Sequence, residues 1–286
     1  MMIGPQLRAQ FPKLHCGRLG PIIGADVPGS AMRLVCLSDT HNLQDNFKVP
    51  EGDVLIHAGD FSNSGNERDV QRFAKWLDRL PHQRKVVIAG NHDWLFVRQP
   101  DLARAYLEPD VTYLQDSGCG IDGLRFWGSP WQPWFMDWAF NLPRNGPKIR
   151  EKWNLIPMDT DVLITHGPPR GILDQVRPQP GGWDPEGGAD SGPLGCEELA
   201  IRLHAVCPRL HVFGHIHGGY GHMAKDGTLF VNASICDECY RPVNLAVIVD
   251  LEPGDPSVPI RVSHQPSRHP KTRRSQPKIT PFPESG

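Results

Sequence analysis

Five short apolar segments of the 286-residue chain are each followed at once by side chains of the types that bind metal ions. In chain order, residues 34–37 precede Asp39 and His41, 54–56 precede Asp60, 86–89 precede Asn91 and His92, 162–164 precede His166, and 210–213 precede His215 and His217. Imidazole, carboxylate and amide ligands in one site suit Mn, Fe, Zn, Co or Ni better than Ca or Mg. The pattern therefore predicts a transition-metal centre, and its ligand types exclude an all-thiolate zinc site.

The five apolar segments have the features of buried β-strands, because they are short, rich in β-branched residues and bounded by turn or polar residues. In an open α/β sheet, ligands bind at the carboxyl ends of the strands, where side chains from several strands converge. Glycines beside the candidate ligands, at Gly59, Gly90 and Gly214, let the backbone turn sharply and approach an ion. One such motif is weak, but five consecutive strand ends with ligand-type residues specify a site strongly.

The ordered motifs resemble the signature of the calcineurin-like metallophosphoesterases. They are Asp39-x-His41, Gly59-Asp60, Gly90-Asn91-His92-Asp93, His166 and Gly214-His215-x-His217, and the likeness runs from about Arg33 to Asp250. Residues 128–134, 165–169 and 211–214 resemble the metallophosphoesterase-domain branch of that superfamily. Some animal members of that branch have glycine where this chain has His215, so the histidine implies a complete second metal site.

The resemblance implies an α/β fold, a layered β-sandwich flanked by helices with its active site at the carboxyl ends of the strands. It also implies two divalent or trivalent transition-metal ions as cofactors. Asp39, His41 and His217 would bind one ion and Asn91, His166 and His215 the other, with Asp60 bridging the two. Two such ions can activate a water molecule and stabilise charge during in-line attack on phosphorus.

His92 and Asp93 are the candidate catalytic residues that follow the ligand Asn91. In the family, the position of His92 contacts phosphate or protonates the leaving alkoxide, and an imidazole that titrates near neutrality suits that task. Asp93 has two open roles: it could orient the ring of His92, or it could cap the helix that follows. Asn91 and His92 are also expected to contact the substrate.

A dense aromatic stretch comprises Trp127, Trp131, Trp134, Phe135, Trp138 and Phe140. These rings could form a core cluster, because aromatic side chains bury large areas. They could also form a wall on which a nucleobase stacks, with Trp131 as the candidate substrate contact. Residues 171–193 form a long segment rich in glycine and proline, and its position just after His166 predicts a loop that faces the substrate.

One domain with two extensions is expected. Apolar residues recur with helical spacing over 70–80 before Pro81, and a second helix is expected over 194–206 before Pro208. Strands that alternate with helices predict a layered α/β core. We therefore expect an N-terminal extension at 1–30, a metallophosphoesterase domain at 31–252, and a largely flexible tail at 253–286, which is basic and rich in proline.

The composition is that of a globular protein, with 39% apolar residues, 22% charged residues and a formal net charge of -2. This charge argues against a basic groove over the whole molecule, although extended nucleic acid stays open as a partner. No apolar stretch approaches the roughly 20 residues of a membrane span, and residues 1–30 lack a signal-peptide core. We expect no membrane partner, a cytoplasmic location, and seven reduced cysteines, because Cys236-x-x-Cys239 lacks further zinc ligands and a redox context.

The expected function is a metal-dependent phosphodiesterase acting on a small phosphoester of the nucleotide type, such as a cyclic nucleotide. A phosphomonoesterase or a nuclease is the alternative within the same class. A scaffold that uses the metal-site fold only to bind a partner is the alternative from a different class, and the presence of His92 argues against it. The sequence specifies neither the native metals nor the oligomeric state.

Overall fold

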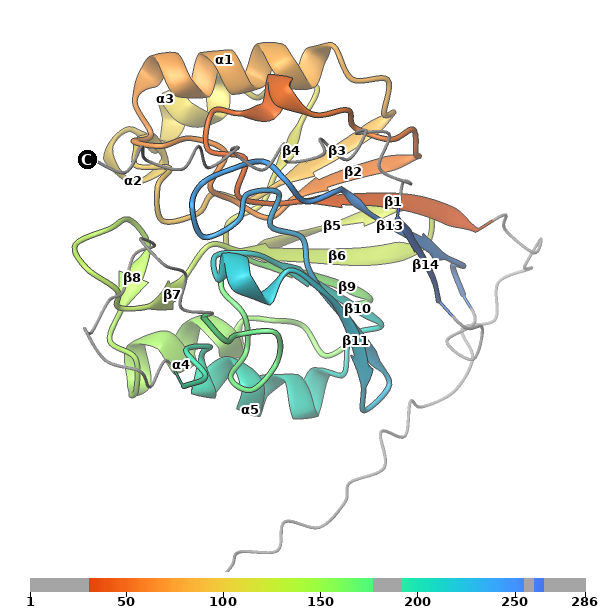
Figure 1. Ribbon diagram of the computed structural model, residues 1–286. Coiled ribbons are helices and arrows are strands. Elements are labelled where there is room, and N and C mark those ends of the chain that lie inside the picture. Colours follow the sequence, from red (N-terminus) through yellow and green to blue (C-terminus); the bar gives the residue numbers. More distant parts are fainter. Residues whose placement is uncertain (1–30, 177–191, 255–259, 265–286) are drawn as a thin grey trace, which may run out of the picture.

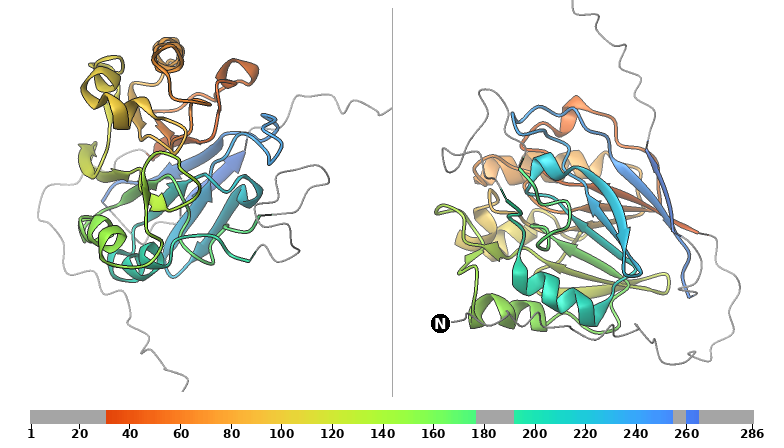
Figure 2. Two further views of the ribbon diagram at one scale, coloured as in Figure 1. Left: turned by 90° about the vertical axis from the view of Figure 1, so that its left-hand side faces the viewer. Right: turned by 60° about the horizontal axis from the view of Figure 1, so that its bottom comes forward.

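Two six-stranded sheets pack against each other and carry helices on their outer faces (Figure 1). The computed structural model describes residues 31–176, 192–254 and 260–264. The view turned by 90° shows the same arrangement, with helices above and below the pair of sheets (Figure 2, left). This arrangement confirms the predicted α/β fold with a layered β-sandwich.

The first sheet has the strand order β14-β13-β1-β2-β3-β4 and the second β11-β12-β10-β9-β6-β5. In the first sheet the strands are β1 (Met32–Leu37), β2 (Val54–His57), β3 (Arg84–Val87), β4 (Thr112–Tyr113), β13 (Val247–Leu251) and β14 (Arg261–His264). In the second they are β5 (Ser117–Ile121), β6 (Leu124–Ser129), β9 (Val162–Thr165), β10 (Leu210–Phe213), β11 (Gly221–Lys225) and β12 (Thr228–Asn232). A small third sheet pairs β7 (Gln132–Pro133) with β8 (Asn141–Leu142).

The strands that precede the candidate ligands run parallel within each sheet. β1, β2 and β3 pair in parallel in the first sheet, and β9 and β10 do so in the second. Both faces of each sheet are covered, which is why these strands are apolar without a break. On β1, Leu34 and Cys36 pack between the sheets, whereas Val35 and Leu37 pack under the helices. The carboxyl ends of the parallel strands therefore lie together at one edge of the sandwich.

The helices divide between the two outer faces (Figure 1). α1 (Glu67–Asp78), α2 (Leu95–Arg98) and α3 (Pro100–Ala105) cover the first sheet, and α4 (Pro147–Asn154) and α5 (Glu197–Val206) cover the second. Two single turns of 3-10 helix, η1 (Gln44–Asn46) and η2 (His217–Gly219), lie in loops. α1 and α5 confirm the two predicted helices, and the side chain of Asn66 caps α1 by accepting the N–H of Asp69 at 3.0 Å.

The predicted tail needs one correction, because part of it belongs to the sheet. β14 pairs antiparallel with β13, and Val262 packs against the core between the sheets. Its short alternation of polar and apolar residues is a weak signal within a basic, proline-rich stretch. Residues 1–30, 255–259 and 265–286 lie outside the described residues. Among the described helices, none is both long enough and apolar enough to span a membrane.

Candidate metal centre

The seven predicted ligands converge at the edge where the parallel strands end. Asp39 and His41 follow β1, Asp60 follows β2, Asn91 follows β3, His166 follows β9, and His215 and His217 follow β10. Five of the seven are buried in the molecule: Asp39, His41, Asp60, Asn91 and His166. His215 and His217 are partly exposed. The convergence predicted from the strand ends is therefore present in the structure.

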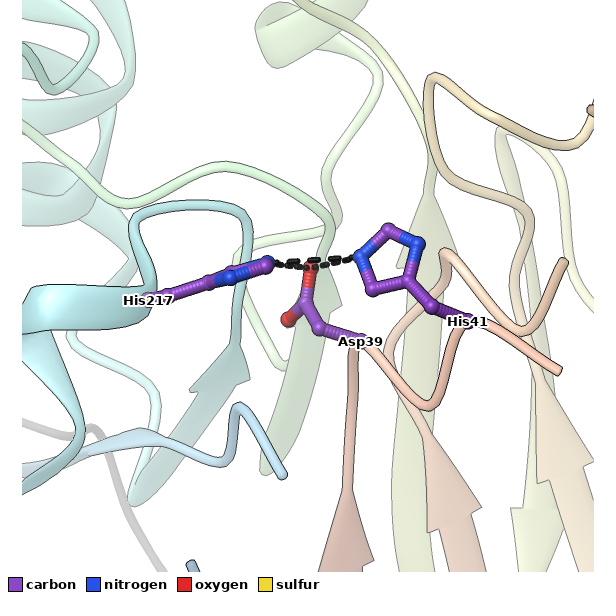
Figure 3. Close-up of side chains that lie close together, drawn as sticks. All are labelled: Asp39, His41 and His217. Carbon is purple, nitrogen blue, oxygen red and sulfur yellow. Dashed lines mark hydrogen bonds and ion pairs between the residues drawn. The ribbon is translucent and has the colours of Figure 1, made fainter. Parts of the chain in front are cut away.

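Asp39, His41 and His217 form the first group, with their polar atoms directed toward one point (Figure 3). The Oδ1 atom of Asp39 lies 3.3 Å from Nε2 of His217 and 4.0 Å from Nε2 of His41. The two imidazole Nε2 atoms are 3.3 Å apart. One carboxylate oxygen and two ring nitrogens thus surround a position that a cation could fill.

Asp60, His166 and His215 form the second group, in which all three ligand atoms lie within 4.8 Å of one another. The side-chain carbonyl of Asn91 lies 2.8 Å from Nε2 of His166 and adds an oxygen to this group. Asp60 stands between the groups, because its Oδ2 atom lies 3.3 Å from Nε2 of His166 and 4.0 Å from Nε2 of His41. The geometry therefore matches two adjacent sites that share one carboxylate.

The backbone is strained where it presents these ligands. Asp39, His41, Asp60 and His215 have φ values of 53°, 43°, 53° and 66°, in the left-handed region that side chains other than glycine rarely adopt. Such conformations cluster at functional sites because the surrounding structure must enforce them. Gly214 has no room for a side chain, since a Cβ there would lie 2.0 Å from Oδ2 of Asp39.

Backbone carbonyls fix the rings of two candidate ligands. The Nδ1–H of His166 donates to the carbonyl of Ala58 at 2.9 Å, and that of His217 donates to the carbonyl of Asp237 at 2.9 Å. In each ring the Nε2 atom is left facing the centre, which is the usual arrangement of histidines that bind metals. Like the ligands, Ala58 and Asp237 come after strands. Their contacts are made by main-chain carbonyls, which every residue has, so the sequence could not predict them.

The electrostatics of the site favour cations. Burial lowers the pKa of His41 to about 4 and the pKa of His215 to about 3, which keeps both rings neutral as metal binding requires. Burial also acts on His166, but the adjacent carboxylate of Asp60 raises the pKa of that histidine to about 9. Within the described residues, every ion pair of Asp39 and Asp60 is with a histidine. Two buried carboxylates whose ion-pair partners are histidines, which can exchange a proton for a metal ion, fit a pair of metal ions.

His92 borders the centre, and its orientation has a different origin from the one predicted. Its Nδ1–H donates to the carbonyl of Asn63 at 2.7 Å, and its Nε2 atom lies 3.9 Å from Oδ2 of Asp60. The carboxylate of Asp93 instead accepts backbone N–H groups from Asp60, Ser62 and Gly90 at 2.9, 3.1 and 2.8 Å.

Neither predicted role of Asp93 matches these contacts. It does not orient the ring of His92, and the following helix, α2, begins without a side-chain cap. Asp93 lies in the buried interior, where it ties the loop after β2 to the loop after β3. It therefore positions Asp60 and the segment that contains Asn91 and His92.

The aromatic stretch divides between the core and the site. Phe140 is buried under the helices of the first sheet. Trp131 packs between clusters, with its indole N–H donating to Asp116 at 2.8 Å and the ammonium of Lys152 4.6 Å from its ring. None of the contacts described for Trp131 involves a candidate ligand. Instead, the ring of Trp138 lies 4.1 Å from that of His92, and Phe135 lies 5.9 Å from His215.

Tyr240 is a site residue that the sequence analysis missed. Its ring centroid lies 4.7 Å from that of His41, 5.3 Å from His217 and 6.3 Å from His92. It belongs to the loop that follows β12, a strand parallel to β10. The carboxyl end of β12 lies at the same edge of the sheet, so the sequence points to this loop, although it does not single out Tyr240.

The loop at 171–193 and the Cys236-x-x-Cys239 motif were also singled out in the sequence. The loop expected at 171–193 is described only at its ends, where the carboxylate of Asp174 accepts N–H groups from Gly171 and Gly195 at 2.8 and 2.9 Å. Its central residues, 177–191, lie outside the described part of the chain. Cys236 is buried, Cys239 is exposed and both thiols are free, and neither belongs to a candidate metal group among the described residues.

Comparisons with known proteins agree with this geometry. The family model described as calcineurin-like phosphoesterase matches residues 32–219. Human metallophosphoesterase domain-containing protein 1 is 44% identical over 268 residues, covering 85% of this chain and 78% of that protein. The UPF0046 protein K07C11.7 of Caenorhabditis elegans is 37% identical, covering 72% of this chain and 71% of that protein.

A solved structure shares the fold. TT1561 of Thermus thermophilus superposes with a TM-score of 0.51 at 15% identity, covering 82% of this chain and 99% of that one. The chain belongs to the calcineurin-like phosphoesterase family. Within it, the relatives place the chain in the metallophosphoesterase-domain branch. It is therefore a metal-dependent phosphoesterase of a family that uses a dinuclear metal centre and acts on small phosphoesters.

Proposed function

We propose that this chain is a phosphodiesterase that hydrolyses small diesters of the nucleotide type, such as cyclic nucleotides. The observation that carries the metal site is the position of Asp60, whose carboxylate lies between His41 of one group and His166 of the other. We assign Asp39, His41 and His217 to one ion, Asn91, His166 and His215 to the other, and Asp60 to both. Two ions bound here would supply a water nucleophile at neutral pH and offset charge on the phosphoryl group.

His92 supplies the proton in this proposal. Its Nδ1–H is held by the carbonyl of Asn63, so Nε2 is the atom that faces the centre and can donate to the leaving oxygen. Asp93 holds the Asp60 loop and the Gly90 loop in fixed positions relative to each other, because its carboxylate accepts backbone N–H groups from both. Trp138 and Tyr240 lie beside His92 and offer aromatic surface to the organic part of a substrate.

The choice of diesters of nucleotides is supported by the aromatic surface beside His92 and by the partial exposure of His215 and His217. It is tested by assaying the protein side by side on cyclic nucleotides, model diesters, nucleoside monophosphates and polynucleotides, each with a panel of divalent metals. Asp60→Asn serves as the inactive comparison, since one amide cannot neutralise two cations as a carboxylate can. Turnover that it retains would come from another site or a contaminant.

The proposal predicts the highest kcat/KM for a small diester and loss of most turnover in Asp60→Asn. A higher value on monophosphates or polynucleotides would replace it with a monoesterase or a nuclease. Absence of turnover under every metal would favour a scaffold.

A further inference from the structure

Two aromatic rings, those of Trp138 and Tyr240, lie near His92. The ring of Trp138 lies 4.1 Å from that of His92 with the two planes 33° apart. The ring of Tyr240 lies 6.3 Å from that of His92, with its plane inclined by 69°. Trp138 comes from the segment between β7 and β8, whereas Tyr240 comes from the loop after β12. Elements far apart in the chain thus bring aromatic surface to one side of the centre, next to the group proposed to donate a proton.

Tyr240 is held in place by an unusual backbone conformation. Its φ is 56°, which is rare for a bulky residue and must be enforced by its surroundings. Its N–H donates to the carbonyl of Asp237 at 2.9 Å, the same carbonyl that accepts Nδ1–H of His217. The carboxylate of Asp237 in turn accepts the N–H groups of Cys239 and Arg241 at 3.0 and 2.9 Å.

This network fixes the tyrosine relative to a candidate ligand, because one carbonyl binds both residues. Tyr240 as a whole is nevertheless 46% exposed. A large aromatic residue whose backbone is fixed by hydrogen bonds, and which stays partly exposed beside the centre, leaves aromatic surface for a bound molecule to cover. Loop packing alone would not require that exposure.

We propose that Tyr240, together with Trp138, is the specificity-determining pair that binds the leaving group of the substrate and favours leaving groups that carry a planar aromatic ring, such as a nucleoside with its base. This inference rests on the proposed function. It adds that the protein discriminates between substrates by their leaving group and not by the group that stays on phosphorus. The group that His92 protonates is the leaving oxygen, so the atoms attached to that oxygen lie next to the rings that surround His92. Phe135 instead contacts His215, on the other metal group, and is placed to contact the retained side.

The test compares two matched pairs of substrates. In the first pair, methyl diesters carry either an aryl or a fluoroalkyl leaving group of the same alcohol pKa. In the second pair, nitrophenyl esters of phenylphosphonate and methylphosphonate share one leaving group and differ only in the retained group, whose P–C bond does not break. Each ratio of kcat/KM values is measured on a single preparation, so a reduced fraction of active protein cancels.

Tyr240→Ala is expected to lower the aryl-to-fluoroalkyl ratio by roughly 5- to 150-fold, the range for loss of one stacking contact, and to leave the phosphonate ratio unchanged. Tyr240→Phe, which keeps the ring, is expected to keep the wild-type value of the first ratio. An equal loss on both leaving groups would overturn the inference and leave Tyr240 as a loop residue. A change confined to the phosphonate ratio would assign it to the retained side.

Failure of the proposed function can be told apart from failure of this inference. If the protein hydrolyses monoesters and no diester, the phosphodiesterase proposal fails. The same comparison is then made with aryl and fluoroalkyl monoesters of matched leaving-group pKa, which have no retained organic group. A wild-type preference for aryl monoesters that Tyr240→Ala removes would still support binding of the leaving group by Tyr240. If the wild type showed no such preference, the inference would be overturned.

Discussion

His92 is the residue whose chemistry can be separated most cleanly from metal binding. Its ring lies beside Asp60 without belonging to either assigned ligand set, and the carbonyl of Asn63 holds its orientation. We predict that His92→Ala keeps the metal content of the wild type and lowers kcat by roughly 10²- to 10⁴-fold on a substrate with a poor leaving group. The loss is smaller for a nitrophenyl ester, whose leaving group hardly needs a proton.

Steady-state kinetics on both esters, with metal content from elemental analysis, check this prediction. Equal losses on good and poor leaving groups would assign His92 to phosphate binding instead of proton transfer. A fall in bound metal would instead identify His92 as a metal ligand. Its Nε2 atom lies 3.9 Å from Oδ2 of Asp60, close enough for both to bind one ion.

Protons and metal ions compete for His166. Because Asp60 raises the pKa of this buried ring to about 9, the metal-free protein holds a proton there at neutral pH. A ligand histidine must be neutral, so metal binding at pH 7 releases that proton, and affinity rises with pH until the ring is already deprotonated near pH 9. Calorimetric titrations at pH 7 in buffers of different ionisation enthalpy measure the release. Metal binding that released no proton, with affinity independent of pH, would contradict this assignment.

Residue types at strand ends were the most predictable feature of the site. All seven predicted ligands converge, because parallel strands carry their end residues to one edge. The roles of Asp93 and Trp131 were not predictable, because they depend on which backbone groups and neighbouring side chains surround them. Tyr240 was missed because its contacts arise from a left-handed backbone conformation that leaves no trace in residue type.

At the scale of elements, the loops after β2 and β3 depend on Asp93. Its buried carboxylate accepts backbone donors from both loops. Asp93→Asn replaces one acceptor oxygen with a donor group that faces other donors. We predict that the free energy of unfolding falls by about 3 kcal/mol and that metal is retained less tightly.

Denaturant unfolding of the metal-free variants measures the first effect. Asp78→Asn, at the exposed end of α1, is the matched control and is expected to change the free energy of unfolding by less than about 0.5 kcal/mol. If Asp93→Asn were as stable as this control, the two loops would not depend on the carboxylate.

At the scale of the whole molecule, the sandwich follows from two sheets that are each covered on both faces. Continuous apolar strands and two helices were visible in the sequence: helical spacing predicted α1, and α5 lies within the segment expected before Pro208. The pairing of β13 with β14 was not visible, because a four-residue edge strand in a basic stretch gives little periodicity. The β-sandwich itself was implied by the family resemblance, and the order of its strands was not predicted.

The central claim is a centre of two metal ions per chain, and metal stoichiometry tests it most directly. Elemental analysis of purified protein loaded with one transition metal is predicted to give two ions for the wild type. His215→Ala removes an imidazole from one group only, so it should hold about one ion and turn over more slowly. His204→Ala makes the same substitution at an exposed position on α5 and should keep two. Two tightly held ions in His215→Ala, or a single ion in the fully active wild type, would contradict the account.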